Sequence, residues 1–170
     1  MRGKTLCLVA SLALAGCGSA TKYQPEAWDG GFNETQLDTN LFKVTFHGNQ
    51  YSKRDRVEEM ALLRCADVAL SHGFTHFVIV DGRNNEDVSS FTAPVETHTT
   101  SKKKKQGDGE SETRSSTYTT GGQTYVSVKP STVNTIMTFK KKPDRAEMVY
   151  DAKFLCGSLG RKYQATCAKA

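Results

Sequence analysis

The stretch from Lys53 to His72 is the strongest structural pattern in the chain, because its apolar residues recur at helical spacing. The residues that share its central apolar face are Val57, Ala61, Cys65 and Val68. The residues that widen this arc beyond half of the circumference are Leu62, Leu63, Ala66, Ala69 and Leu70. A helix that is apolar over so much of its surface has to pack against more than one element.

The ends and the polar side of this helix carry further signals. Ser52 is a favourable N-cap residue, and Gly73 provides a left-handed stop. The remaining sector gathers polar residues with Met60 among them, and Arg64 and Asp67 are spaced to pair across one turn. With Arg56 they form either a patch for a partner protein or a solvated helix face.

Alternating or continuous apolar runs predict strands on both sides of the helix. Residues 41–46 alternate, residues 74–80 are apolar on both faces as in a central strand, and residues 132–139 alternate again. A last helix is expected over about residues 150–159, stopped by Gly160. We therefore predict an α+β fold. It has a βαβ unit, a third strand antiparallel to the second after a long hairpin-like insertion, and a C-terminal helix.

The insertion at residues 97–124 is of low complexity, rich in Ser, Thr and Gly, and contains the run Lys102 to Lys105. Because it offers little to bury, we expect disorder or a floppy hairpin tip. Its flanks, residues 88–95 and 125–128, alternate weakly and extend the hairpin, which Pro130 is expected to end. The four lysines, Lys102, Lys103, Lys104 and Lys105, either keep a loop solvated or contact an anionic surface such as lipid headgroups.

The N-terminus has the order of features found in a bacterial lipoprotein signal. Arg2 and Lys4 precede the apolar stretch 5–15, and Ala15-Gly16-Cys17 follows. This resemblance to a lipobox implies cleavage between Gly16 and Cys17, a thioether-linked diacylglycerol on Cys17, and a further acyl chain such as palmitate on its amine. An ordinary secretory signal or an N-terminal anchor is the alternative. Gly18 rather than Asp after the cysteine implies the outer membrane, facing the periplasm.

These features divide the chain into a signal (1–16), a lipidated N-terminus with a flexible tether (17–40), one α+β domain (41–160) and a C-terminal tail (161–170). The tether is expected because Gly, Asp, Asn and Pro25 are frequent there.

Three cysteines remain for the folded domain in an oxidising compartment. Cys156 could pair with Cys167, or Cys65 could pair with Cys156 if the two helices pack together. All three could also be small buried apolar residues. No CxxC or His-rich cluster accompanies them, so we expect no metal.

Known catalytic and cofactor motifs are missing from the sequence. Removal of residues 1–16 takes away Arg2 and Lys4 and lowers the formal net charge from +5 to +3, which is too mild to predict nucleic-acid binding. His76 is the histidine most worth inspecting, since it lies within a predicted strand. We expect neither a cofactor nor an enzymatic activity.

The run Gly48-Asn49-Gln50-Tyr51-Ser52, the helix that follows and Gly73-Phe74-Thr75-His76-Phe77 resemble a family of uncharacterised proteobacterial lipoproteins. The likeness covers roughly residues 29–80 and, more loosely, 130–160. This family brings no known activity. The layout is also similar to small envelope lipoproteins, including the Rcs-type outer-membrane stress sensor, but this chain has too few cysteines for that sensor's disulfide framework.

The sequence thus favours a non-enzymatic envelope lipoprotein, held at the membrane by its lipid and acting through an envelope protein partner or surface contacts. An envelope-stress sensor is the alternative, and a cell-envelope enzyme is the least favoured.

Overall fold

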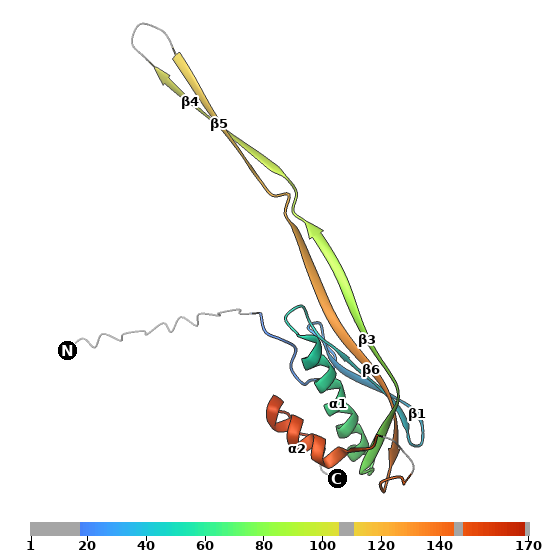
Figure 1. Cartoon of the computed structure of the whole chain (residues 1–170). Helices are drawn as coiled ribbons and strands as arrows, with labels where there is room; N and C mark the ends of the chain where they lie inside the picture. The colour runs from blue at the N-terminus through green and yellow to red at the C-terminus, as the bar shows by residue number, and fades with distance from the viewer. Residues whose placement is uncertain (1–17, 106–110, 145–147, 169–170) are drawn as a thin grey trace, which may run out of the picture.

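The computed structural model describes residues 18–105, 111–144 and 148–168, so the predictions for the signal, Gly16 and Cys17 lie outside the described residues. The fold is α+β, as predicted. A small head carries a sheet with two helices on one side, and a long β ribbon extends from one end of it (Figure 1). We call residues 88–128 the arm and the other described residues the head.

The head contains a five-stranded sheet in which all neighbouring strands are antiparallel. In order across the sheet, its strands are β1 (Gly31–Asp38), β2 (Leu41–His47), β6 (Thr124–Phe139), β3 (His76–Thr92) and β7 (Tyr150–Asp151). The predicted antiparallel pairing of the third strand with the second is confirmed as β6 with β3.

The predicted βαβ unit is present in a split form. The strands β2 and β3 flank helix α1 (Arg54–Ser71) in the chain, but they are not neighbours in the sheet, because β6 lies between them. Both are antiparallel to β6 and hence parallel to each other. The returning strand of the arm therefore completes the centre of the sheet.

The core forms between the sheet and α1. Helix α2 (Ala152–Tyr163) packs beside α1 on the same side of the sheet (Figure 1). The predicted apolar face of α1 is buried, together with side chains from three strands. The main core side chains outside α1 are Phe42, Val44, Phe46, Phe77 and Ile136. The placement of Met60 in the polar sector was wrong, since it is fully buried in a second cluster with Phe46 and Val57.

The two predicted ends of α1 have different outcomes. Gly73 adopts a φ of +76° directly after the helix, which confirms the left-handed stop. Ser52 was the wrong N-cap, because Lys53 is the N-cap residue and makes no side-chain cap. The Ser52 hydroxyl instead accepts a hydrogen bond from the Thr21 backbone N–H at 3.0 Å. It thereby fixes the N-terminal segment to the head.

The predicted flexible tether at residues 17–40 is the largest error. Residues 31–38 form edge strand β1, which pairs along its length with β2. The segment before it is also fixed, since Thr21 is buried and its hydroxyl donates to the Asp29 carbonyl at 2.7 Å. Phe32 lies under the guanidinium of Arg64, 3.9 Å from it. Backbone pairing and this cation–π contact replace the apolar alternation that the sequence lacks.

The arm is a regular two-part hairpin, so for the described residues of 97–124 the expected hairpin is confirmed and the alternative of disorder was wrong. Its inner part continues β3 and β6, and its outer part pairs β4 (Glu96–Lys105) with β5 (Ser111–Thr120). Gly121 and Gly122 have φ values of 92° and 77° at the joint. A Cβ on Gly121 would lie 1.9 Å from the Pro94 carbonyl oxygen, so only glycine fits there. The predicted flanks are confirmed, since Val88 pairs with Val128.

Strand β6 does not stop at Pro130, which lies within it opposite Glu86, but the exposed arm ends close to this residue. The Pro130 carbonyl accepts a hydrogen bond from the Gly48 N–H at 2.8 Å. Gly160 does not stop α2 either; it is buried inside the helix, which ends at Gln164 in a left-handed conformation. The predicted tail therefore begins as helix.

One ionic network ties both ends of the described chain to α1. The buried carboxylate of Asp67 accepts hydrogen bonds from Tyr23 Oη, Arg64 Nη1 and the Ala168 backbone N–H, each at 2.7 Å. Arg64 also pairs with Glu34 on β1 at 2.6 Å. Burial, with the hydrogen bond to Asp67, raises the pKa of the Tyr23 phenol above its usual range. The predicted pairing of Arg64 with Asp67 is confirmed, but this face is covered by both chain ends.

Replacing Asp67 with Ala removes all three bonds and leaves Tyr23 and the Ala168 amide without their acceptor. We expect the free energy of unfolding to fall by about 2 kcal/mol or more, measured by urea denaturation. Asp55→Ala is the matched control, since Asp55 is an exposed acid on the same helix, and it should cost about 0.5 kcal/mol. Equal losses in the two variants would contradict a central role for Asp67.

Candidate interaction surfaces

More than half of the large apolar side chains that are exposed in the described chain belong to the arm. They are Val88, Phe91, Val95, Tyr118, Tyr125, Val126 and Val128. Strand alternation places Phe91 opposite Tyr125 on one face of the ribbon and Val88 opposite Val128 on the other. Both aromatic rings stay in solvent, with exposed fractions of 64% and 59%. A concentration of this kind is typical of a contact surface.

The outer ribbon is polar, with one aromatic pair. His98 and Tyr118 stack with ring centroids 5.0 Å apart, and Thr99 and Thr117 share a hydrogen bond at 3.2 Å between their hydroxyls. Hydroxyl and imidazole groups on adjacent strands can donate and accept hydrogen bonds with a polar partner.

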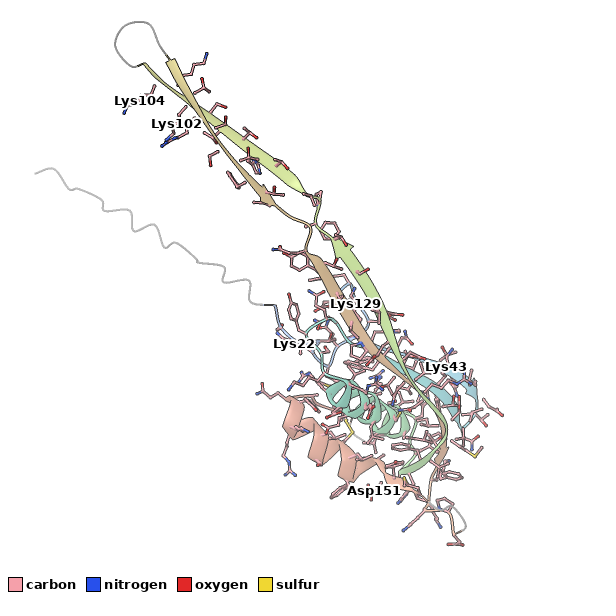
Figure 2. The ribbon with its side chains drawn as sticks, turned by 45° about the horizontal axis from the view of Figure 1, so that its top comes forward. Lys22, Lys43, Lys102, Lys104, Lys129 and Asp151 are labelled. Carbon is pink, nitrogen blue, oxygen red and sulfur yellow. A yellow bond between two sulfur atoms is a disulfide. The ribbon has the colours of Figure 1, made fainter. Side chains whose placement is uncertain are left out.

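The predicted lysine run lies on β4. Lys102 and Lys104 lie near the far end of the arm (Figure 2), and Lys102 stands opposite Arg114. Lys103 faces the other side of the ribbon, and the side chain of Lys105 lies outside the described residues. Because Lys102, Lys103 and Lys104 are all exposed, cations are available on both faces of the arm.

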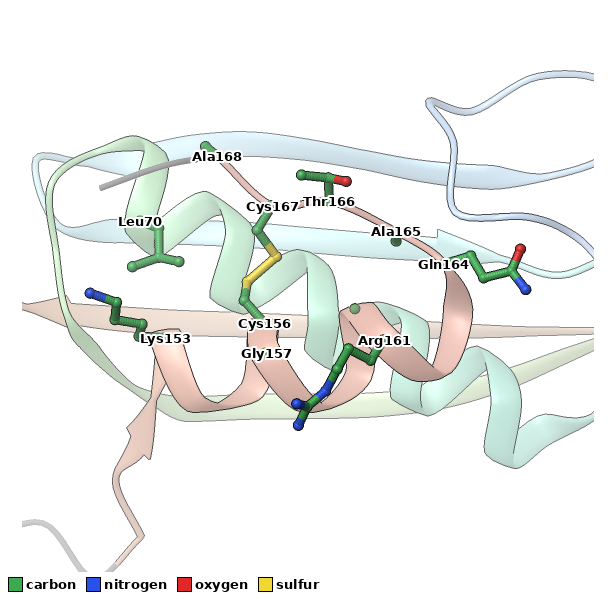
Figure 3. A pocket seen from close by; sticks show the side chains of 11 residues that line it. Leu70, Lys153, Cys156, Gly157, Arg161, Gln164, Ala165, Thr166, Cys167 and Ala168 are labelled. Carbon is green, nitrogen blue, oxygen red and sulfur yellow. A yellow bond between two sulfur atoms is a disulfide. The ribbon is translucent and has the colours of Figure 1, made fainter.

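A groove of about 780 Å³ runs between α2 and the segment that follows it (Figure 3). The disulfide between Cys156 and Cys167 lies in its wall, and Leu70 of α1 contributes apolar surface. Lys153 lies at one end of the groove and Gln164 at the other, with Arg161 between them on α2. Among the described residues, the groove lining combines apolar surface with the polar side chains of Gln164 and Thr166.

The structure selects between the predicted cysteine pairings. Cys156 is bonded to Cys167, and the alternative pairing with Cys65 is wrong because Cys65 is a free thiol on the buried face of α1. The Asn134 side-chain amide donates to the Cys65 sulfur at 3.8 Å. Burial raises the pKa of this thiol to about 12, so it is protonated and unreactive at neutral pH.

His76, the histidine singled out in the sequence, is half-buried beside Thr75, with Nδ1 2.8 Å from the threonine hydroxyl. Among the described residues no group of three or more His, Cys, Asp or Glu side chains is placed to hold a metal ion. Within the same residues, no helix has both the length and the apolar character needed to span a membrane.

Two exposed aromatic residues in the N-terminal part of the head were not predicted as site residues. The side chain of Trp28 is 96% exposed, and that of Tyr51 is 55% exposed. Trp28 lies in a tight turn closed by reciprocal hydrogen bonds between Ala27 and Gly30, both at 3.1 Å. The assignment of residues 17–40 to a flexible tether meant that Trp28 was not considered as a site residue.

Comparison with known proteins finds no matching family model, no matching curated protein and no matching solved structure.

The cysteine assignments predict a simple labelling pattern in a chain without residues 1–16 that carries Cys17→Ser. In the folded state the single free thiol should react only very slowly with maleimide at pH 7. In denaturant the same thiol should react roughly 100-fold faster. Mass spectrometry should place that label on Cys65, and Cys65→Ala should abolish it. Labelling of Cys156 or Cys167 without a reductant would contradict the disulfide.

Proposed function

We propose that this protein is a lipid-anchored envelope lipoprotein, attached through Cys17, that acts without catalysis by contacts of its arm. The observation that carries the proposal is the arm itself. Its strands begin in the core of the head and continue far beyond it (Figure 1). Its outer part pairs only with itself in the sheets of the described chain.

The composition of the arm supports a role in contact. Side chains such as Phe91, Tyr125 and Val126 gain little from burial in this chain, because most of their surface is exposed to solvent. A partner that covered them would recover that hydrophobic stabilisation. The exposed lysines Lys102 to Lys104 add an electrostatic contact, for which we propose anionic headgroups, at about 1 kcal/mol for each cation near such a surface.

The sequence supports the anchor, since an apolar stretch of residues 5–15 precedes Ala15-Gly16-Cys17. Two or more acyl chains give stable attachment, whereas a single chain holds only marginally. We propose the outer membrane, with the head in the periplasm.

Cys17→Ser should abolish incorporation of labelled palmitate and move the protein from the membrane pellet to the soluble fraction of lysed cells. Cys7→Ser alters the other cysteine of the N-terminal region and is the matched control. It should leave palmitate incorporation and membrane fractionation unchanged. Density-gradient separation of the two membranes should place the wild type in the outer membrane. Palmitate labelling that survives in Cys17→Ser would contradict the assignment.

A photo-crosslinking residue at Tyr118 or Val126 should give adducts in living cells, and the same residue at exposed Ser158 on α2 should give few. Adducts with a protein identify an envelope partner, and adducts with lipid at position 104 identify headgroup contact.

Replacing residues 93–123 with Asn-Gly should remove the adducts at Val126. It should change the free energy of unfolding of the head by less than about 0.5 kcal/mol, because the outer ribbon pairs only with itself. Equal adduct yields at Val126 and Ser158 would contradict arm-specific contact.

A further inference from the structure

The chain is fixed to the head from its first described residue. Gly18 lies against the ring of Tyr51, so closely that a Cβ there would meet the ring at 2.4 Å. The Asn49 side-chain amide donates to the Ser19 carbonyl at 2.8 Å. Since Cys17 directly precedes Gly18, any lipid on Cys17 is attached within one residue of the rigid head.

The exposed ring of Trp28 belongs to the same surface. Thr21 connects the two parts, because its hydroxyl donates to the Asp29 carbonyl and accepts from the Asn49 N–H at 2.9 Å. Trp28 and Asn49 also line one small hollow of about 170 Å³, whose charged lining includes Lys129 and the acids Glu26, Asp29 and Asp87. Hydrogen bonds therefore join the segments that carry Gly18, Trp28 and Tyr51.

We propose that this surface, which we call the docking face (Gly18, Lys22, Trp28, Tyr51 and Lys53), rests on the lipid bilayer with Trp28 and Tyr51 at the headgroup level. The proposal rests on the proposed lipidation of Cys17. Trp and Tyr have an apolar ring with a polar tip, and they favour the membrane–water interface for that reason. Lys22 and Lys53 are exposed on the segments near these residues, and they supply cations for headgroup phosphates.

Docking of this face would also determine where the arm lies. Gln50, the neighbour of Tyr51, lines a hollow with Phe91 and Tyr125 at the base of the arm. Lys22 and Lys129 lie toward the arm end of the head, whereas Asp151 lies at the opposite end (Figure 2). A docked head therefore holds the base of the arm next to the same membrane that carries the lipid.

The test uses Trp28 as its own probe, because it is the only tryptophan in the chain. The mature chain from Cys17 is coupled through that cysteine to a maleimide phospholipid in vesicles, since Cys65 is buried and the other two cysteines are paired. We expect blue-shifted Trp28 emission. We also expect an iodide quenching constant roughly threefold or more below that of the same protein without vesicles. Bromine labels near the headgroups should quench more than labels deep in the acyl chains.

The matched control moves the tryptophan to the far end of the head. Phe154, with an exposed fraction of 72%, follows Asp151 on the first turn of α2. In the double variant Trp28→Phe and Phe154→Trp, iodide quenching should be the same with and without vesicles. Equal quenching of Trp28 in the two conditions would overturn the docking face.

This readout is independent of whether cells lipidate Cys17, because the coupling is chemical. If Trp28 is protected from iodide on vesicles but cells incorporate no palmitate, the lipid anchor is overturned and the docking face is supported. Palmitate labelling with an unprotected Trp28 would overturn the docking face alone. In the native lipoprotein, Tyr51→Ser should raise the iodide quenching constant of Trp28 roughly twofold, because one of the two interfacial rings is lost.

Discussion

The buried carboxylate of Asp67 is the interaction on which the arrangement of the head depends. An isolated charge in this position would be strongly unfavourable, and three donors at 2.7 Å compensate for it. Two of these donors come from Tyr23 and Ala168, near opposite ends of the described chain. One side chain of α1 therefore holds the N-terminal and C-terminal segments against the same helix.

This attachment has a direct consequence for the lipid anchor that we propose at Cys17. A tether would let the head turn freely above such an anchor, whereas a fixed N-terminal segment would transmit the position of the anchor to the whole head. Thr21, Ser52 and Asn49 carry that connection from the first described residues to the start of α1. The orientation of the arm then follows from the fold, because β3 and β6 run without interruption from the core into the arm.

Sequence patterns predicted those elements whose apolar periodicity is visible within a single segment. The apolar periodicity around Cys65 located α1, and alternation located β2 and β6. The arm shows the limit of reasoning from burial alone. Its Ser- and Thr-rich strands form because their backbones pair with each other and because β-branched threonine suits a strand, even though they bury little. Strand β1 was missed for a related reason, since it depends on pairing with β2 and on the contact of Phe32 with Arg64.

By itself, the sequence determined the α+β class, the extent of α1 and the existence of a hairpin insertion, because each follows from periodicity or composition within one segment. Only the tertiary structure decided that Cys156 pairs with Cys167, that Ser52 binds Thr21 rather than capping α1, and that Asn49 also binds Thr21. In these cases the residues in contact are separated in the chain, or one residue has more than one possible partner. Their energies depend on distances that no local pattern encodes.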